Sequence, residues 1–201
     1  MPKKVALLVL WCTILGIGVA MLLLAALGSD GFSTLTNGIS LAMDVHFFVV
    51  NTVLSGLMLA VAWRRGMALG IGAILQPLVV GASISVVLHL GTEPDAMAAR
   101  IALLAAAIPV ITVGVAGYLA TGAGAGPAEA AVQSFDPPVP FRWGYSTFQA
   151  TGSLVGWLLG AAIGPGTILV ILLLGPLVDL LSARVRIFHI VPQRRDPALT
   201  T

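Results

Sequence analysis

The chain has 201 residues, of which 58% are hydrophobic and 9% are charged, and its mean hydropathy is +1.04. So little polar surface cannot cover a water-soluble globule of this length, which excludes an ordinary soluble domain. The net charge of +2 is explained below by membrane topology, and it gives no indication of a nucleic-acid partner.

Six apolar runs are long enough to cross a hydrocarbon layer about 30 Å thick, which takes about 20 helical residues. The first run follows Lys3 and Lys4, but it is longer than the core of a typical signal peptide, so we expect a permanent helix there. The six predicted transmembrane helices cover residues 5–27, 47–63, 67–89, 100–120, 143–163 and 167–183.

Two shorter helices are predicted between these runs, over residues 32–42 and 128–135, where apolar residues follow a helical spacing. Asp30 or Ser29 suits the N-cap of the first. Pro127 suits the first helical position of the second, and Glu129 suits its first turn. We expect both helices to be amphipathic or re-entrant, the first on the outer side and the second on the inner side.

The second half of the sequence repeats the first. Residues 5–8 recur at 101–104, an offset of 96, and after a two-residue contraction residues 61–81 recur at 155–175 with ten identities. Four glycines and a tryptophan are among these identities, which a shared membrane composition does not readily produce. Three crossings in each half is an odd number, so the halves enter the bilayer from opposite sides.

The expected fold class is therefore an all-α membrane protein with six transmembrane helices as two inverted three-helix repeats, each with a short amphipathic or re-entrant helix. The predicted units are residues 1–96 and 97–186, followed by a cytoplasmic tail over 187–201. With both termini in the cytoplasm of a bacterial cell, nine of the ten basic residues lie inside, as the positive-inside rule expects for an inner-membrane protein. Only Arg100 lies outside.

Glycine motifs occur at matching places in the two halves. The first half has Leu27-Gly28-Ser29-Asp30-Gly31-Phe32 and Gly70-Ile71-Gly72, and the second has Gly124-Ala125-Gly126-Pro127 and Gly164-Pro165-Gly166. In these motifs the chain resembles the YczE-like family of bacterial integral membrane proteins over residues 5–182. Members of that family often carry Ser-Pro where this chain has Ser29-Asp30. The resemblance implies a membrane fold and supplies no substrate.

Small residues at helical spacing allow close packing of helices in lipid. Alternatively, glycine motifs at corresponding positions of two inverted halves interrupt helices and expose backbone groups to a cavity, or they serve as helix caps. The hinge or packing candidates are Gly66, Gly70, Gly72, Gly160, Gly164 and Gly166.

Polar side chains inside the apolar runs form a second set of candidates. Asn51 and Ser55 lie four residues apart, and their repeat partners are Tyr145 and Gln149. Such groups either bond across helices or line a wet cavity, because unpaired amides are costly in hydrocarbon. The substrate-path candidates are Asn51, Gln76, Tyr145, Gln149 and Asp179, and the helix-start candidates are Asp30, Gly126, Pro127 and Glu129.

No catalytic triad, phosphate loop or paired-histidine motif is present. Cys12 is the single cysteine, so no intramolecular disulfide can form, and Asp44-x-His46 lacks a third ligand nearby. We expect no enzyme activity, no cofactor and no metal. The sequence favours a permease that moves a small molecule or ion through the lipid bilayer. The alternatives are a non-transporting accessory or scaffold protein, with a membrane protein partner or a second copy, and a lipid-handling protein with an apolar lateral groove.

Overall fold

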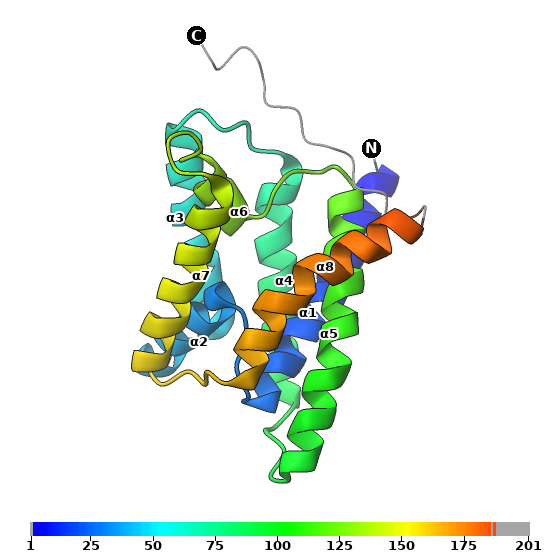
Figure 1. The fold of residues 1–201 in the computed structure, drawn as a ribbon, viewed down its shortest axis with the longest axis vertical. Coiled ribbons are helices and arrows are strands. Elements are labelled where there is room, and N and C mark those ends of the chain that lie inside the picture. The colour runs from blue at the N-terminus through cyan, green and yellow to red at the C-terminus, as the bar shows by residue number, and fades with distance from the viewer. Residues whose placement is uncertain (1, 186, 188–201) are drawn as a thin grey trace.

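The computed structural model describes residues 2–185 and 187, and it is helical with no strand in that part of the chain (Figure 1). Five helices are long and apolar enough to cross a membrane, so this is a helical protein with the composition of a membrane protein. Its helices are α1 (Pro2–Ala25), α2 (Gly31–Met43), α3 (Phe47–Arg64), α4 (Ile71–Leu90), α5 (Met97–Ala120), α6 (Pro127–Gln133), α7 (Phe141–Leu158) and α8 (Pro165–Arg184).

The fifth predicted span, residues 143–163, corresponds to α7, which is not among the five apolar helices. Its 18 residues include Gln149 together with several serines, threonines and glycines, which lower its hydropathy. The other predicted runs differ from helices α1, α3, α4, α5 and α8 by a few residues at their ends. The predicted tail lies outside the described residues except for Ile187.

The two predicted short helices are present as α2 and α6. Of the two N-cap candidates for α2, Asp30 occupies the position, and its Oδ2 accepts a hydrogen bond from the Ser33 N–H at 3.0 Å. Pro127 stands at the start of α6, as its fixed φ and missing N–H favour.

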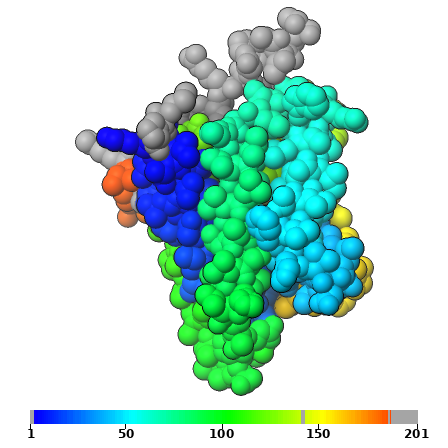
Figure 2. Space-filling view, turned by 180° about the vertical axis from the view of Figure 1, so that it is seen from behind, coloured from blue at the N-terminus to red at the C-terminus, as the bar shows by residue number. Residues whose placement is uncertain are grey.

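The helices form two layers, and each layer takes helices from both halves of the chain. One layer, the inner layer, consists of α1, α4, α5 and α8, and the second, the lateral layer, consists of α2, α3, α6 and α7 (Figure 1). The layers meet where α4 packs on α3 and α6; in the view of Figure 2, α4 lies between α1 and α3. The chain passes between layers at four links, over residues 26–30, 65–70, 121–126 and 159–164.

Helix α1 lies in the centre of the inner layer. Its buried residues Leu8, Cys12, Leu15, Val19 and Leu22 alternate at spacings of three and four, as one face of a helix requires. The α1–α5 contact is closest at two glycines. A Cβ at Gly18 would lie 2.9 Å from the Ile111 nitrogen, and a Cβ at Gly114 would lie 2.6 Å from the Leu15 nitrogen. Adding 96 to the positions of Gly18 and Leu15 gives those of Gly114 and Ile111, so the two contacts correspond under the repeat offset.

Each link between the layers contains a glycine with positive φ, a conformation that other residues rarely adopt. This corrects the predicted packing role of two glycines. Gly66 and Gly160 do not continue a helical face with Gly70 and Gly164; they end α3 and α7, and no atom lies within 4 Å of a Cβ built on either. The positive-φ glycines are Gly28, Gly66, Gly122, Gly124 and Gly160.

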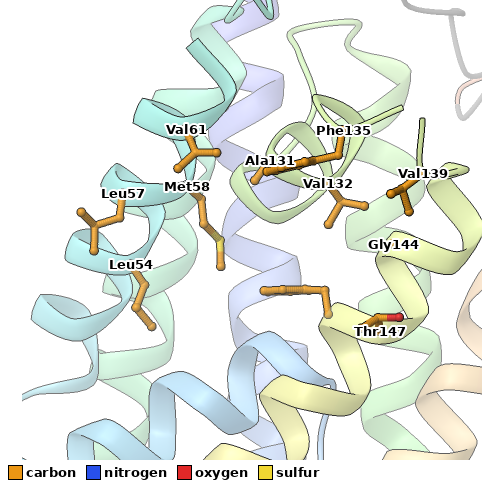
Figure 3. Close-up of a pocket in the computed structure, with 11 residues that line it drawn as sticks. Leu54, Leu57, Met58, Val61, Ala131, Val132, Phe135, Val139, Gly144 and Thr147 are labelled. Carbon is orange, nitrogen blue, oxygen red and sulfur yellow. The ribbon is translucent and has the colours of Figure 1, made fainter. Parts of the chain in front are cut away.

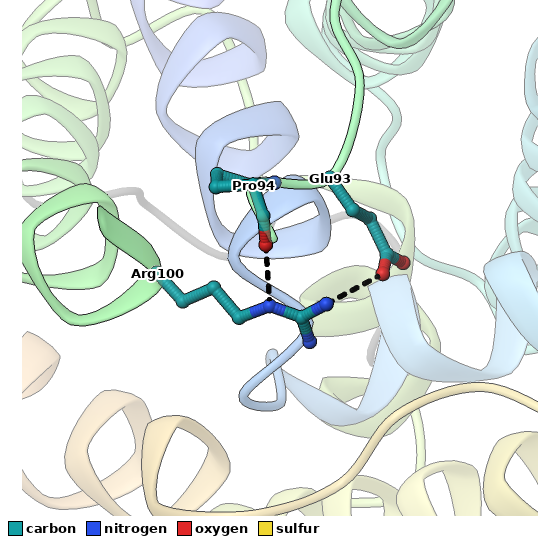
Figure 4. A network of polar contacts seen from close by, with 3 residues as sticks. All are labelled: Glu93, Pro94 and Arg100. Atoms are coloured by element: carbon teal, nitrogen blue, oxygen red, sulfur yellow. Dashed lines mark hydrogen bonds and ion pairs between the residues drawn. The ribbon is translucent and has the colours of Figure 1, made fainter. Parts of the chain in front are cut away.

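Arg100, the basic residue expected on the outer side, is neutralised locally at the start of α5. Its Nε donates to the Pro94 carbonyl at 2.7 Å, and its Nη2 lies 3.3 Å from Glu93 Oε2 (Figure 4). Glu93 lies on the segment that joins α4 to α5, and Arg100 lies in the first turn of α5, so the charge is compensated where it stands.

Candidate functional site

Each of the two short helices has a carboxylate at its start. In α2 the third residue is Ser33, and its N–H is capped by Asp30. In α6 the third residue is Glu129, an acidic residue in the first turn of the helix. Burial raises the pKa of the half-buried Glu129, its own N–H lowers that pKa in part, and the charge of Asp30 raises it further. The two carboxylates therefore lie within electrostatic range of each other.

Helix α7 brings two more predicted residues to this place. The Tyr145 hydroxyl lies within electrostatic range of both Glu129 and Asp30. Gln149 is buried, and its Oε1 has no hydrogen-bond partner among the described residues. The Gln149 backbone touches Gly31, where a Cβ would collide with it, so the start of α2 sits directly on α7.

The inner layer contributes Gln76 from α4 and Tyr118 from α5. The Gln76 Nε2 would lie 3.4 Å from a Cβ at Gly126, the N-cap of α6, and Gly126 also contacts the Glu129 carboxylate. Tyr118 is buried within range of the charge of Glu129. Asp30, Gln76, Tyr118, Glu129, Tyr145 and Gln149 are called the interlayer cluster, because they come from both layers.

Sequence reasoning missed Tyr118. A tyrosine near the end of an apolar run is usually taken as an anchor at the membrane surface. One available signal was that the chain has only two tyrosines, and both belong to the interlayer cluster.

Asn51 also joins the layers, beside the interlayer cluster. Its side chain is 3% exposed, and Nδ2 donates to the Pro77 carbonyl on α4 at 2.8 Å. Gly81 leaves room for this amide, since a Cβ there would lie 2.5 Å from Nδ2. Asn51 thus makes the interhelical bond that was one of its two predicted roles.

The structure does not bring Asp179 together with these residues. Asp179 is exposed on α8, whereas the members of the interlayer cluster are buried or half-buried. A path through the interlayer cluster therefore does not continue through Asp179 in this conformation.

The remaining predicted glycines mark contacts between backbones. The Gly72 N–H donates to the Ala123 carbonyl at 2.8 Å, and the Gly166 N–H donates to the Leu27 carbonyl at 2.8 Å. Gly70 and Gly164 are the N-caps of α4 and α8 beside these bonds. The start of each of these helices is therefore held by the loop after α5 or α1, from the other half of the chain.

Comparison with known proteins assigns the chain to a family. The family of unknown function DUF6198 matches residues 2–183. An uncharacterized protein of Haemophilus influenzae (strain ATCC 51907 / DSM 11121 / KW20 / Rd) is 26% identical over 193 residues, which cover 94% of this chain and 88% of that protein. No solved structure matches the chain.

Proposed function

The chain belongs to the DUF6198 family, and we propose that it is a permease-like membrane protein in which the lateral layer moves against the inner layer to pass a small solute or ion. The observation that carries this proposal is the interlayer cluster. It gathers two carboxylates, two tyrosines and two amides where the lateral layer meets an inner layer whose core is apolar. Ionisable groups at membrane depth are costly and commonly mark substrate or ion paths.

Two inverted halves, residues 1–96 and 97–186, account for the arrangement. Helices α1, α4 and α7 run from one end of the molecule to the other, while their repeat partners α5, α8 and α3 run back (Figure 1). The contacts between helices also follow the repeat. Helix α1 packs on α4 as α5 packs on α8, and α2 packs on α7 as α6 packs on α3. Trp63 and Trp157, equivalent in the repeat, stand in the last turns of α3 and α7, which end at opposite ends of the molecule. These features support six crossings, with α7 as the least apolar.

The charge distribution supports an orientation with both termini in the cytoplasm of a bacterial cell. Lys3 and Lys4 begin α1, and Arg64, Arg65 and Arg184 stand at the ends of α3 and α8 on the same end of the molecule (Figure 1). By the positive-inside rule this end faces inward.

The links between layers supply the means of movement. All five positive-φ glycines among the described residues lie in those four links. Gly66 and Gly160 have open space around them, so the backbone can change direction there without a collision. Layers that are stiff inside and joined at glycines move as units, as hinge motions require.

The experiment that tests this proposal measures water access to the layer boundary. In a Cys12→Ala background, Asn51→Cys and Gln149→Cys variants in membranes are treated with a small charged thiol reagent. Both positions are buried in this conformation, so labelling reports a second conformation that opens the boundary. Ile84→Cys is the matched control, because Ile84 is 1% exposed and lies in the apolar core.

We expect slow labelling at positions 51 and 149 and none at 84. Equal inertness at all three positions would leave a boundary that never opens to water, and the permease proposal would fail. Stoichiometric capture of a protein partner after mild crosslinking, together with that inertness, would favour the accessory or scaffold alternative.

A further inference from the structure

An apolar groove lies on the lateral layer between α3 and α7, and the ring of its lining residue Phe148 lies 6.5 Å, between centroids, from that of Tyr145 in the interlayer cluster. Its volume is about 480 Å³, within the range of ligand pockets. Leu54, Leu57, Met58 and Val61 form the wall on α3, and Thr147 belongs to the opposite wall on α7 (Figure 3). Helix α6 and the segment after it close one end with Ala131, Val132 and Phe135.

One wall of the groove is the exposed side of α3, a helix that is long and apolar enough to cross a membrane. Leu57 is 60% exposed and Val61 is 41% exposed, although both are apolar. Their helix α3 is one of the five apolar helices. A molecule that enters this groove therefore comes from the lipid phase.

The closed end of the groove carries positive charge. The Arg65 guanidinium lies over the Phe135 ring, with Cζ 4.0 Å from the ring centroid, and its Nε donates to the Ser134 carbonyl at 2.9 Å. Phe135 itself lines the groove. Arg64 precedes Arg65, and the segment 134–140 has one carboxylate, Asp136. The rim thus has an excess of positive charge next to an apolar wall.

The groove runs from this charge along α3, over a length that fits within one leaflet of a bilayer. From Val61, near Arg65, the wall runs seven residues along α3 to Leu54, which is about 10 Å at 1.5 Å per residue. That length is about two thirds of a leaflet, taken as half of a hydrocarbon core of about 30 Å. A charged headgroup at Arg65 and an acyl chain along α3 fit these positions together.

We propose that this groove binds an anionic phospholipid, with its phosphate beside Arg65 and one acyl chain against Leu54, Met58 and Val61. Charge complementarity selects the anionic headgroup, because a basic residue near the membrane surface attracts such lipids by about 1 kcal/mol. The Arg65 guanidinium is held in place by Phe135 and by the Ser134 carbonyl, so the lipid meets a preorganised partner.

Native mass spectrometry of the full chain in mild detergent tests the proposal. Delipidated protein is titrated with dioleoylphosphatidylglycerol, and with dioleoylphosphatidylcholine as the neutral comparison. We expect stoichiometric retention of the anionic lipid. Arg65→Gln should weaken its binding about fivefold, the ratio that corresponds to roughly 1 kcal/mol. Lys4→Gln removes one charge from the same end of the molecule, away from the groove, and should change little.

Two variants fill the groove from opposite walls. Met58→Trp and Thr147→Trp should each abolish retention, whereas Val53→Trp, exposed on α3 outside the groove, should retain the lipid. Size-exclusion elution checks the fold of each variant, and either filling variant alone is sufficient. Equal binding of the two lipids, or retention in a folded filling variant, would refute the proposal. So would efficient disulfide crosslinking of two chains through Leu57→Cys in the Cys12→Ala background, because a second copy would then occupy the groove.

Discussion

The amide of Asn51 is tied to the carbonyl of Pro77 across the boundary between the two layers, at a distance of 2.8 Å. Any separation of the layers at this point breaks the hydrogen bond. The bond stands beside the interlayer cluster, so it stabilises the conformation in which that cluster is closed.

Asn51→Ala should lower the free energy of unfolding by about 0.5–2 kcal/mol, the range for an interhelical side-chain hydrogen bond in a membrane protein. Ser55→Ala, one turn away on α3, is the matched control, because the Ser55 hydroxyl is buried without a hydrogen-bond partner among the described residues. Its loss should be nearly neutral. Thermal unfolding in detergent, followed by circular dichroism, measures both. An equal loss in both variants would mean that the Asn51 bond contributes nothing.

Gly72→Ala and Gly166→Ala should each destabilise the protein by about 1–3 kcal/mol, the usual cost of overpacking. A Cβ at Gly72 would lie 2.8 Å from the Ala123 carbonyl oxygen, and a Cβ at Gly166 would lie 2.6 Å from that of Gly28. Both contacts are with backbone atoms, which cannot move aside as a side chain can. Denaturant unfolding of the two variants checks this, and unchanged midpoints would show that these loops yield easily.

Gly160→Ala should cost about 1–2 kcal/mol, although no atom stands near position 160, because its φ of +101° strains any residue with a Cβ. Gly56→Ala is the control that distinguishes backbone strain from a lack of space for the side chain. Gly56 lies inside α3 with equally open surroundings, and alanine should stabilise a helix there by about 0.5–1 kcal/mol. Opposite signs for the two variants in the same unfolding assay are expected. The same sign in both would argue against a strained turn at the end of α7.

Stability should fall with rising pH through Glu129. Its pKa is raised in the folded protein above the ordinary value of 4.5, so the folded state favours the protonated form. That contribution is complete below pH 4.5 and is lost as the pH rises through the higher folded-state pKa. Glu129→Gln, which stays neutral, should therefore raise the thermal midpoint at pH 7.5 more than at pH 4.

Melting curves at pH 4 and at pH 7.5 check this prediction. The variant should show a smaller difference between the two pH values than the natural chain. A difference of the same size would assign the pH dependence to other groups.

The helices could be predicted from the sequence because their signals are local. Apolar length located the five long helices to within a few residues, and Asp30 and Pro127 marked the starts of α2 and α6. The layers could not be predicted in this way. A repeat offset identifies which elements correspond, but it does not say which elements pack together. The bonds between Gly72 and Ala123 and between Gly166 and Leu27 join backbone atoms, so no side-chain type announces them.

The candidate site was predicted in part for the same reason. Polarity in apolar runs pointed to Asn51, Gln76, Tyr145 and Gln149. The structure bonds Asn51 to α4, places Gln76 beside the start of α6, sets Tyr145 within electrostatic range of Glu129 and buries Gln149 against α2. Polarity also pointed to Asp179, which is exposed on α8. A carboxylate in an apolar run costs free energy if it is buried without a partner. The position of the neighbouring helix decides whether the carboxylate is buried with a partner or exposed.

The carboxylates at the starts of α2 and α6 have a consequence for tracing this protein's ancestry. The acid stands at the N-cap in one half, as Asp30, and at the third helical residue in the other, as Glu129, yet both place a carboxylate at the start of a short helix. A chain under selection can thus exchange one arrangement for the other and lose the column-by-column match while keeping the negative charge in place. An alignment of homologues position by position would score such an exchange as two unrelated substitutions. Only a comparison of both positions together would show that the carboxylate at the start of the helix was retained.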